Sequence, residues 1–365
     1  MEAKDQGLNR SRIDRLRFCF SELHTDALLV SHPANIRYLC GFSGSAGLLL
    51  VDPAKATLFT DSRYTFQARE EVKGAQVQIA KKGIVKAVGN ALLRKRGQPL
   101  VGYSAGHLTV AQKEALQSAA GGGIRWVKDA SVVERMRAVK DREELKVMRA
   151  AAELISEVFR RVTPEVKPGI SELEVAGKIE YTMKQLGASG PSFDTIVASG
   201  ARSAWAHAQP TAKILKKSEL VVLDHGAILR GYCSDLTRTL YLGRTPQKLR
   251  KLYDAVLEAQ AAAKNAIRPG VTAGEVDAAA RGTLRRHGFA KYFTHSTGHG
   301  LGLEIHEMPR LGKGEKFVLQ EGMVVTVEPG VYVEGLGGIR IEDDVVVSAQ
   351  GAVELTTAPR ELIEN

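Results

Sequence analysis

The sequence predicts two domains, an α/β domain at the N-terminus and a larger α+β domain that follows it. Three observations lead to this prediction: a length of 365 residues, a first third in which short apolar runs alternate with helical patterns, and a motif that recurs further along the chain. A single hydrophobic core stops growing beyond roughly 250–300 residues, so a chain of this length is expected to divide.

The N-terminal domain is expected to begin with an amphipathic helix over residues 10–23. Four apolar residues recur there at helical spacing, namely Ile13, Leu16, Phe20 and Leu23. A turn, Asp52-Pro53-Ala54-Lys55, favours a hairpin between the second and third predicted strands. The predicted strands cover residues 27–30, 46–51, 57–59, 100–103 and 124–127, and a further helix covers 109–119.

The boundary between the domains is predicted near residue 137, which gives domains of residues 1–137 and 138–365. A charged run, RAVKDREEL, begins at this position and leads into a helical pattern that continues to Val162. One long helix inside a single domain is the alternative, and the length of the chain disfavours it.

The second domain contains an internal repeat. The segment KPGISELEV, which begins at Lys167, resembles RPGVTAGEV, which begins at Arg268. In each copy Pro-Gly is followed by a hydroxyl residue with a glutamate three positions later, which is the pattern of a capping box at the start of a helix. Residues that end one helix and begin the next could give the same pattern by chance. Similarity at seven of nine positions nevertheless favours a duplicated half.

Composition and charge disfavour several classes of protein. The longest apolar run, GLLLV, is far shorter than the roughly 20 residues that cross a bilayer, and the N-terminus lacks the apolar segment of a secretory signal. The net charge of +10 comes from scattered basic groups without aromatic neighbours, which favours a solvated surface over nucleic-acid binding. Three widely spaced cysteines indicate free thiols, so a cytoplasmic protein that binds neither membrane nor nucleic acid is expected.

Four segments of the second domain concentrate acidic and histidine side chains. If the first of them closes as a hairpin at Leu229-Arg230-Gly231, Asp224 and Asp235 are expected to face each other directly, with Cβ atoms roughly 5 Å apart. Two buried carboxylates at this separation need a shared proton or a cation. The segments are LVVLDHGAILRGYCSDLTRTLYLG from residue 220, THSTGHGLGLEIHEMP from 294, VVTVEPGVYVE from 324 and GGIRIEDDVVV from 337.

Each of these acidic residues has a structural explanation when it is taken alone. Asp224 could end a strand at a turn, and Glu342 could form a salt bridge with Arg340. Taken together, two Asp, two Glu and one His form an oxygen-rich set with one nitrogen donor, which suits a pair of divalent cations. Two such cations would cancel the four negative charges.

The order of these motifs resembles the pita-bread dinuclear metallopeptidases, which include aminopeptidase P, prolidase and methionine aminopeptidase. The order is Asp-(10 residues)-Asp, then Gly-His-Gly with His-Glu-x-Pro, then Val-Glu-Pro-Gly, then Arg-Ile-Glu-Asp. The resemblance covers the second domain and implies an α+β pita-bread catalytic domain with pseudo-twofold duplication. It also implies the ligands of two divalent metal ions, which are Asp224, Asp235, His299, Glu328 and Glu342, with Asp235 and Glu342 bridging.

The resemblance implies roles for further side chains. Glu328 would accept a proton from the attacking water, and His306 would stabilise the tetrahedral intermediate or assist the leaving nitrogen. His207 and His295 match family histidines that line the substrate pocket, and His207 is predicted for catalysis as well, with a surface loop as its alternative. His225 is expected to point to the opposite face of its strand, so a structural role is predicted rather than a sixth ligand.

The first domain narrows the expected activity. The segment FTDSRY at residues 59–64 looks like the creatinase-like N-terminal α/β domain of bacterial aminopeptidase P and prolidase. The resemblance therefore implies a homodimer that hydrolyses the N-terminal Xaa-Pro bond of peptides by means of a water bridging two metals. Mn²⁺ is the expected metal, with Co²⁺, Zn²⁺ and Fe²⁺ as alternatives.

Three functions stay open within this resemblance. Xaa-Pro aminopeptidase is favoured, because no residue is identified that would hold the carboxylate of a dipeptide. Xaa-Pro dipeptidase (prolidase) is the alternative. A pita-bread module that binds a peptide or protein without cleaving it is the non-enzyme alternative.

Overall fold

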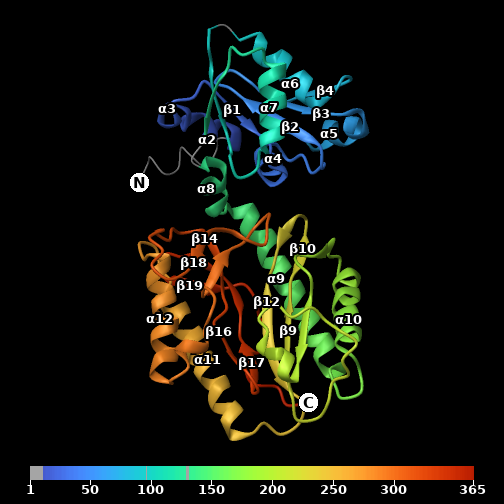
Figure 1. Ribbon diagram of the computed structural model, residues 1–365, viewed down its shortest axis with the longest axis vertical. Helices are drawn as coiled ribbons and strands as arrows, with labels where there is room; N and C mark the ends of the chain where they lie inside the picture. The colour runs from blue at the N-terminus through green and yellow to red at the C-terminus, as the bar shows by residue number, and fades with distance from the viewer. Residues whose placement is uncertain (1–10, 96, 129–130) are drawn as a thin grey trace. The chain divides into compact units, whose positions relative to one another are not determined.

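In the computed structural model, which describes residues 11–95, 97–128 and 131–365, the chain divides into two units, Met1–Arg137 and Ala138–Asn365. Figure 1 shows the helices and strands of both units. No helix within the described ranges is long and apolar enough to cross a membrane.

The first unit is built around a mixed sheet with the strand order β4-β3-β2-β1-β5-β6. The strands are β1 (Ala27–Val30), β2 (Gly47–Val51), β3 (Ala56–Thr60), β4 (Gln76–Ile79), β5 (Leu100–Tyr103) and β6 (Arg125–Lys128). The helices are α2 (Arg12–Phe18), α3 (Phe20–Leu23), α4 (Pro33–Cys40), α5 (Thr65–Glu71), α6 (Ile84–Leu93), α7 (Val110–Ala119) and α8 (Val132–Ala138), with a 3₁₀ turn, η1 (Ser62–Tyr64). The predicted α/β class of this unit is confirmed.

Local chemistry explains the turn between β2 and β3. Asp52 closes the predicted turn between β2 and β3, because its Oδ1 accepts hydrogen bonds from the backbone N–H groups of Ala54 and Lys55 at 2.9 and 2.8 Å. The helix predicted over residues 10–23 is interrupted at Cys19, which ends α2 and begins α3, and residue 10 lies outside the described residues.

The second unit contains two pairs of long helices and several small sheets. The helices are α9 (Arg142–Val162), α10 (Glu172–Gln185), α11 (Gln247–Ala266) and α12 (Ala273–Arg286), with 3₁₀ turns η2 (Thr163–Glu165), η3 (Gly200–Ala204) and η4 (Ala290–Tyr292). The strands are β7 (Gly190–Pro191), β8 (Ile196–Ser199), β9 (Leu220–His225), β10 (Ala227–Leu229), β11 (Tyr232–Cys233), β12 (Leu236–Tyr241), β13 (Gly298–Gly300), β14 (Glu307–Leu311), β15 (Val324–Val327), β16 (Gly330–Val333), β17 (Gly337–Arg340), β18 (Asp343–Ser348) and β19 (Gly351–Glu354).

The strands of this unit form four sheets between the helix pairs. The two larger groups have the orders β12-β9-β8 and β14-β13-β15-β18-β19, and the smaller ones are β11-β10-β7 and β16-β17. Figure 1 shows α9 and α10 on one side of the strands and α11 and α12 on the other. We call the part from α9 to β12 the first half of the unit and the part from α11 to β19 the second half.

The predicted duplication of this unit is confirmed by matching local structure. Both capping boxes form, Ser171 with Glu174 at the start of α10 and Thr272 with Glu275 at the start of α12. Each repeat also makes the same backbone hydrogen bonds to a segment about 40 residues further on. The equivalent pairs are Gly169 N–Leu215 O and Gly270 N–Leu319 O, then Glu172 N–Lys213 O and Ala273 N–Phe317 O, then Leu173 N–Thr211 O and Gly274 N–Glu315 O.

The hairpin over residues 220–243 has a different register from the predicted one. Its turn consists of Arg230 and Gly231, which both have positive φ (50° and 87°), as two-residue hairpin turns require. Asp224 therefore pairs with Thr237, and Asp235 lies two positions before Thr237. The predicted direct pairing of Asp224 with Asp235 is wrong, because the centre of the turn falls between Arg230 and Gly231. Diagonal neighbours of this kind still share one face of a ribbon, roughly 7 Å apart.

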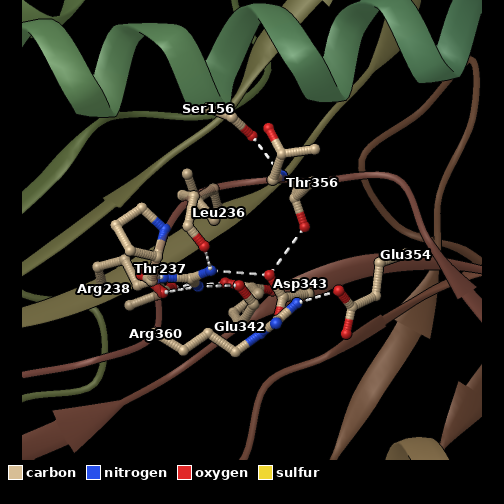
Figure 2. Close-up of polar contacts among 12 residues, drawn as sticks. Ser156, Leu236, Thr237, Arg238, Glu342, Asp343, Glu354, Thr356 and Arg360 are labelled. Atoms are coloured by element: carbon tan, nitrogen blue, oxygen red, sulfur yellow. Dashed lines mark hydrogen bonds and ion pairs between the residues drawn. The ribbon is translucent and has the colours of Figure 1, made fainter.

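A buried ionic network joins the two halves of the unit (Figure 2). Asp343 of β18 is fully buried and accepts hydrogen bonds from Arg238 of β12 at 2.8 Å and from Arg360 at 2.5 Å. Thr356 and Gln260 donate to the same carboxylate at 2.9 and 2.6 Å. Burial alone would raise the pKa of Asp343, but the two guanidinium groups outweigh it and hold that pKa below its usual value. The carboxylate is therefore ionised and fully paired.

Asp343→Asn is expected to lower the free energy of unfolding by about 3 kcal/mol, because removing one partner of a buried ion pair leaves the other charge uncompensated. Denaturant titration followed by circular dichroism measures this change. Glu354→Gln is the control, since it removes another partner of Arg360 whose side chain is 39% exposed, and it should cost less than about 1 kcal/mol. Equal effects of the two substitutions would contradict the central role of Asp343.

Candidate metal centre and active site

The five predicted metal ligands lie in or beside the strands of the second unit. Asp224 belongs to β9 and His299 to β13. Asp235 directly precedes β12, and Glu328 directly follows β15. Glu342 lies in the break between β17 (Gly337–Arg340) and β18 (Asp343–Ser348). A break in pairing at this position lets the side chain turn toward the other carboxylates.

Distances between the side chains place these residues around one site. His299 Nε2 lies 3.6 Å from Asp235 Oδ2 and 3.6 Å from Glu328 Oε1. One ligand atom each of Asp235, His299 and Glu342 lies within 4.8 Å of the other two. Asp224 faces the same site, because its charge raises the pKa of Asp235 and of Glu342.

The site leaves buried oxygens without protein partners. Asp224 Oδ1 and Asp235 Oδ1 are inaccessible to solvent and accept no hydrogen bond from any residue that the structure describes. A buried carboxylate oxygen in this state costs free energy unless something compensates it. Oxygen-rich sites of this kind suit divalent cations.

The pKa values of these groups also indicate a site that suits cations. Burial, followed by repulsion from neighbouring carboxylates, raises the pKa of Asp235 and of Glu342 well above their usual values. Burial also raises the pKa of Glu328 to about 8. Burial and the neighbouring His306 lower the pKa of His299 to about 4, so its imidazole is neutral and can donate a lone pair to a metal. The residues therefore fit a pair of divalent cations.

Two neighbouring residues, Arg340 and Thr237, orient the carboxylates. Arg340 donates from Nη2 to Asp224 Oδ2 at 2.5 Å, and from Nη1 to the Tyr332 hydroxyl at 2.5 Å. Thr237 donates to Glu342 Oε2 at 2.5 Å and accepts from Arg340 Nε at 3.1 Å. The sequence alternative that paired Arg340 with Glu342 is thus replaced by a pair with Asp224. No motif marks Thr237, since its role depends on the hairpin register.

The predicted catalytic and substrate-binding histidines lie at the edge of this cluster. His295 Nδ1 is 4.0 Å from Glu328 Oε2, and its Nε2 is 3.0 Å from the Tyr332 hydroxyl. The ring of His306, an exposed residue, packs edge-on against His299 with centroids 4.4 Å apart. His207 is exposed in the loop after η3. Burial of His306 is the main cause of its lowered pKa, and the charge of His207 is the second cause.

His225 lies on the other side of β9 from this cluster. It is fully buried, its Nδ1 is 2.8 Å from the carbonyl oxygen of Leu236, and its ring packs edge-on against Phe159. These contacts agree with a structural role.

The glycines of the GHG segment allow close packing of neighbouring strands. A Cβ atom on Gly298 would lie 2.0 Å from the carbonyl oxygen of Thr326, and one on Gly300 would lie 2.2 Å from that of Met308. The glycines therefore let β13 approach β15 and β14 closely, which carries His299 into the site.

A cleft of about 680 Å³ lies beside the histidines. Trp205 and Tyr332 supply its aromatic surface, and Thr294 and Glu334 supply polar groups. Tyr332 also contacts His295, so the cleft adjoins the carboxylate cluster. A mostly apolar cleft with a few polar groups is typical of a site that binds a small organic ligand.

Two family descriptions match the chain. Residues 146–349 match Metallopeptidase family M24, and residues 12–139 match the Creatinase/Prolidase N-terminal domain. The Xaa-Pro dipeptidase of Pyrococcus furiosus is 37% identical over 355 residues, which is 97% of this chain and 100% of that protein.

Two solved structures are similar over nearly the whole chain. The structure of an Xaa-Pro dipeptidase from Bacillus anthracis has a TM-score of 0.93 at 38% identity and covers 97% of this chain and 99% of its own. That of an X-Pro aminopeptidase from Thermotoga maritima has a TM-score of 0.89 at 35% identity and covers 98% and 100%. With the fold, the carboxylate cluster and these likenesses taken together, the chain belongs to metallopeptidase family M24 and is a dinuclear metallopeptidase with a creatinase-type N-terminal domain and a pita-bread catalytic domain.

Proposed function

We propose that this enzyme is an Xaa-Pro dipeptidase, which cleaves the peptide bond between an N-terminal residue and a following proline. The observation that carries the proposal is a complete set of five candidate ligands in one buried site, in a chain that resembles Xaa-Pro dipeptidases along almost its entire length. The sequence alone favoured Xaa-Pro aminopeptidase, but the relatives support the dipeptidase alternative better. Xaa-Pro aminopeptidase remains the second candidate because of the Thermotoga maritima structure.

Asp224, Asp235, His299, Glu328 and Glu342 would hold two divalent cations, and we propose Mn²⁺, with Co²⁺, Zn²⁺ or Fe²⁺ able to occupy the same donor set. When bound, such cations lower the pKa of a water molecule between them and polarise the scissile carbonyl group. A homodimer in the cytoplasm, as expected from the sequence, completes the proposal.

The protein's own residues supply proton transfer and positioning. Glu328 is the proposed base, since its Oε2 faces His295 and burial raises its pKa to about 8 in the absence of cations. His306, exposed beside His299, is proposed to donate a hydrogen bond to the reacting oxygen or to protonate the departing proline nitrogen. His207 and His295 are proposed to contact the peptide at the mouth of the cleft.

A dipeptidase also needs a cation for the carboxylate of its substrate. Arg310 of β14 is exposed and is the direct partner of His299 in the sheet, so the two residues share one face. We propose that its guanidinium group binds the proline carboxylate. This assignment supplies the residue that sequence reasoning alone did not identify.

Asp235→Asn and Glu342→Gln are each expected to reduce the bound metal below two ions per chain and to lower turnover by at least about 10²-fold, while the fold is kept. Mass spectrometry of the metal content, with circular dichroism for the fold, checks both parts. Glu334→Gln, an exposed glutamate of the cleft, is the control and should keep two ions. A variant with two ions and normal turnover would refute the ligand assignment.

Metal binding should release protons and weaken as the pH falls. Burial raises the pKa of Glu328 to about 8, so below pH 8 a proton occupies the carboxyl group in the metal-free protein and must leave before a cation can bind. Affinity is therefore expected to rise with pH between 6 and 8. Titration calorimetry in buffers with different ionisation enthalpies counts the released protons. An affinity that does not change between pH 6 and 8 would contradict the raised pKa.

Comparison of kcat/KM for Xaa-Pro and Xaa-Pro-Xaa with the same metal tests the substrate. The dipeptide is expected to be preferred, and Arg310→Met should lower kcat/KM for the dipeptide by about 10²-fold, since a charge-assisted hydrogen bond is lost, while leaving the tripeptide nearly unchanged. Rapid cleavage of the tripeptide by the unaltered enzyme would instead establish the aminopeptidase alternative.

A further inference from the structure

One loop of the second unit supplies half of the lining of the cleft beside the histidines. We call residues 199–211 the cleft loop, which begins at the last residue of β8 and includes η3 and His207. Four of the eight residues that line the cleft belong to this loop, namely Ala201, Ala204, Trp205 and Ala206. A binding site on a loop keeps its shape only where the surrounding scaffold holds that loop in place.

Glu172, in the first turn of α10, holds both ends of the cleft loop. Its Oε1 accepts hydrogen bonds from the backbone N–H and the hydroxyl group of Ser199, at 2.9 and 2.8 Å. Its Oε2 accepts hydrogen bonds from the backbone N–H and the hydroxyl group of Thr211, at 3.1 and 2.8 Å. Each oxygen of one carboxylate therefore fastens one end of the loop to the start of α10.

We propose that Glu172 is a positioning residue of the active site, which acts through the cleft loop on the binding of the peptide. The proposal rests on the proposed function, because it requires that the peptide binds in this cleft. Glu172 itself would not touch the substrate.

Arg202 extends the attachment to the middle of the cleft loop. Its Nε lies 3.1 Å from Glu172 Oε2, and its Nη2 donates a hydrogen bond to the carbonyl oxygen of Gln209 at 2.5 Å. Its guanidinium carbon lies 4.9 Å from the centroid of the Trp205 ring, which is within the range of a cation–π contact. Arg202 thus connects the buried carboxylate to the aromatic wall of the cleft.

The charge state of Glu172 suits a fixed anchor. The residue is fully buried, and burial alone would raise its pKa. Hydrogen bonds from Ser199 and Thr211, together with the charge of Arg202, outweigh burial and hold the pKa of Glu172 below its usual value. The carboxylate is therefore ionised, and hydrogen bonds to an ionised acceptor are stronger than neutral ones.

A second set of contacts ties the cleft loop to β17. The backbone N–H of Gly338 donates to Ser203 Oγ at 2.9 Å, and Arg340 Nη1 donates to the carbonyl oxygen of Ala206 at 3.1 Å. These contacts do not involve Glu172, so they would remain when its carboxylate is lost. The partners of Glu172 in the described structure, Ser199, Thr211 and Arg202, are not candidate metal ligands. Loss of Glu172 should therefore loosen the cleft and leave the metal in place.

Steady-state kinetics of Glu172→Gln tests the proposal. This substitution keeps the shape of the side chain but removes the charge that holds the cleft loop. With the peptide that the unaltered enzyme cleaves fastest, KM is expected to rise about tenfold, while kcat changes by less than about twofold and the metal content stays the same. Glu174→Gln is the matched control, since this exposed glutamate of the same helix bonds to Ser171 and should leave KM unchanged.

The mobility of Trp205 gives a readout that does not depend on the substrate. The chain has two tryptophans, Trp126 and Trp205, so Trp126→Phe leaves Trp205 as the reporter of the cleft loop. Time-resolved fluorescence anisotropy measures the fast motion of this ring. The amplitude of that motion is expected to increase about twofold when Glu172→Gln is added to the Trp126→Phe background.

Arg202→Met is the second variant, and it keeps the test decisive if Glu172→Gln does not fold. The side chain of Arg202 is 19% exposed, so its loss disturbs the interior less, and it should likewise raise KM and the mobility of Trp205. An unchanged KM with unchanged anisotropy in a folded variant would overturn the proposal. Loss of metal with a matching loss of kcat would overturn it too, because Glu172 would then support the ligands and not the cleft. Failure of the dipeptidase assignment would appear separately, in the comparison of dipeptide with tripeptide, and would leave the anisotropy result standing.

Discussion

Four carboxylates lie together in the interior of the second unit, and the surrounding structure is arranged so that they can remain there. Isolated buried carboxylates are costly, and these groups also repel one another. Arg340 neutralises part of the charge at Asp224, and the Thr237 hydroxyl supports Glu342. Burial, together with repulsion from neighbouring carboxylates, raises the pKa values of Asp235, Glu328 and Glu342. Divalent cations would supply the missing positive charge.

The neighbours Glu342 and Asp343 show how partners decide the state of a buried acid. Both are almost inaccessible to solvent, yet the pKa of Glu342 is raised and that of Asp343 is lowered. Consecutive residues of an extended chain point to opposite sides, so Glu342 faces other carboxylates whereas Asp343 faces Arg238 and Arg360. The ion pairs of Asp343 hold the backbone on one side (Figure 2), and Glu342 on the other side lies close to Asp235 and His299.

Features set by local chemistry could be predicted from the sequence, and features set by long-range geometry could not. The capping boxes of α10 and α12 depend on residues three positions apart, and the confirmed duplication followed from them. The hairpin register depends on the backbone of Arg230, which has a positive φ although it is not a glycine. The residue pattern does not predict this conformation. The pairing of Arg340 with Asp224 joins residues far apart in the chain, so it could not be read from spacing.

The two halves of the duplicated unit share one frame but contribute different candidate ligands to the site. Each half has the same frame of a capped helix hydrogen-bonded to a following strand segment, but Asp224 and Asp235 come from the first half and the other three candidate ligands from the second. The halves are joined at the site itself, because the Thr237 carbonyl accepts from the backbone N–H of Glu342 at 3.1 Å while the Thr237 hydroxyl donates to the Glu342 carboxylate. Cations bound there would link the two halves of the unit. Because a backbone hydrogen bond already joins these halves at the site, little rearrangement would be needed when the cations bind. Preorganisation of this kind is what electrostatic catalysis requires, since donors fixed in advance do not have to be ordered during the reaction.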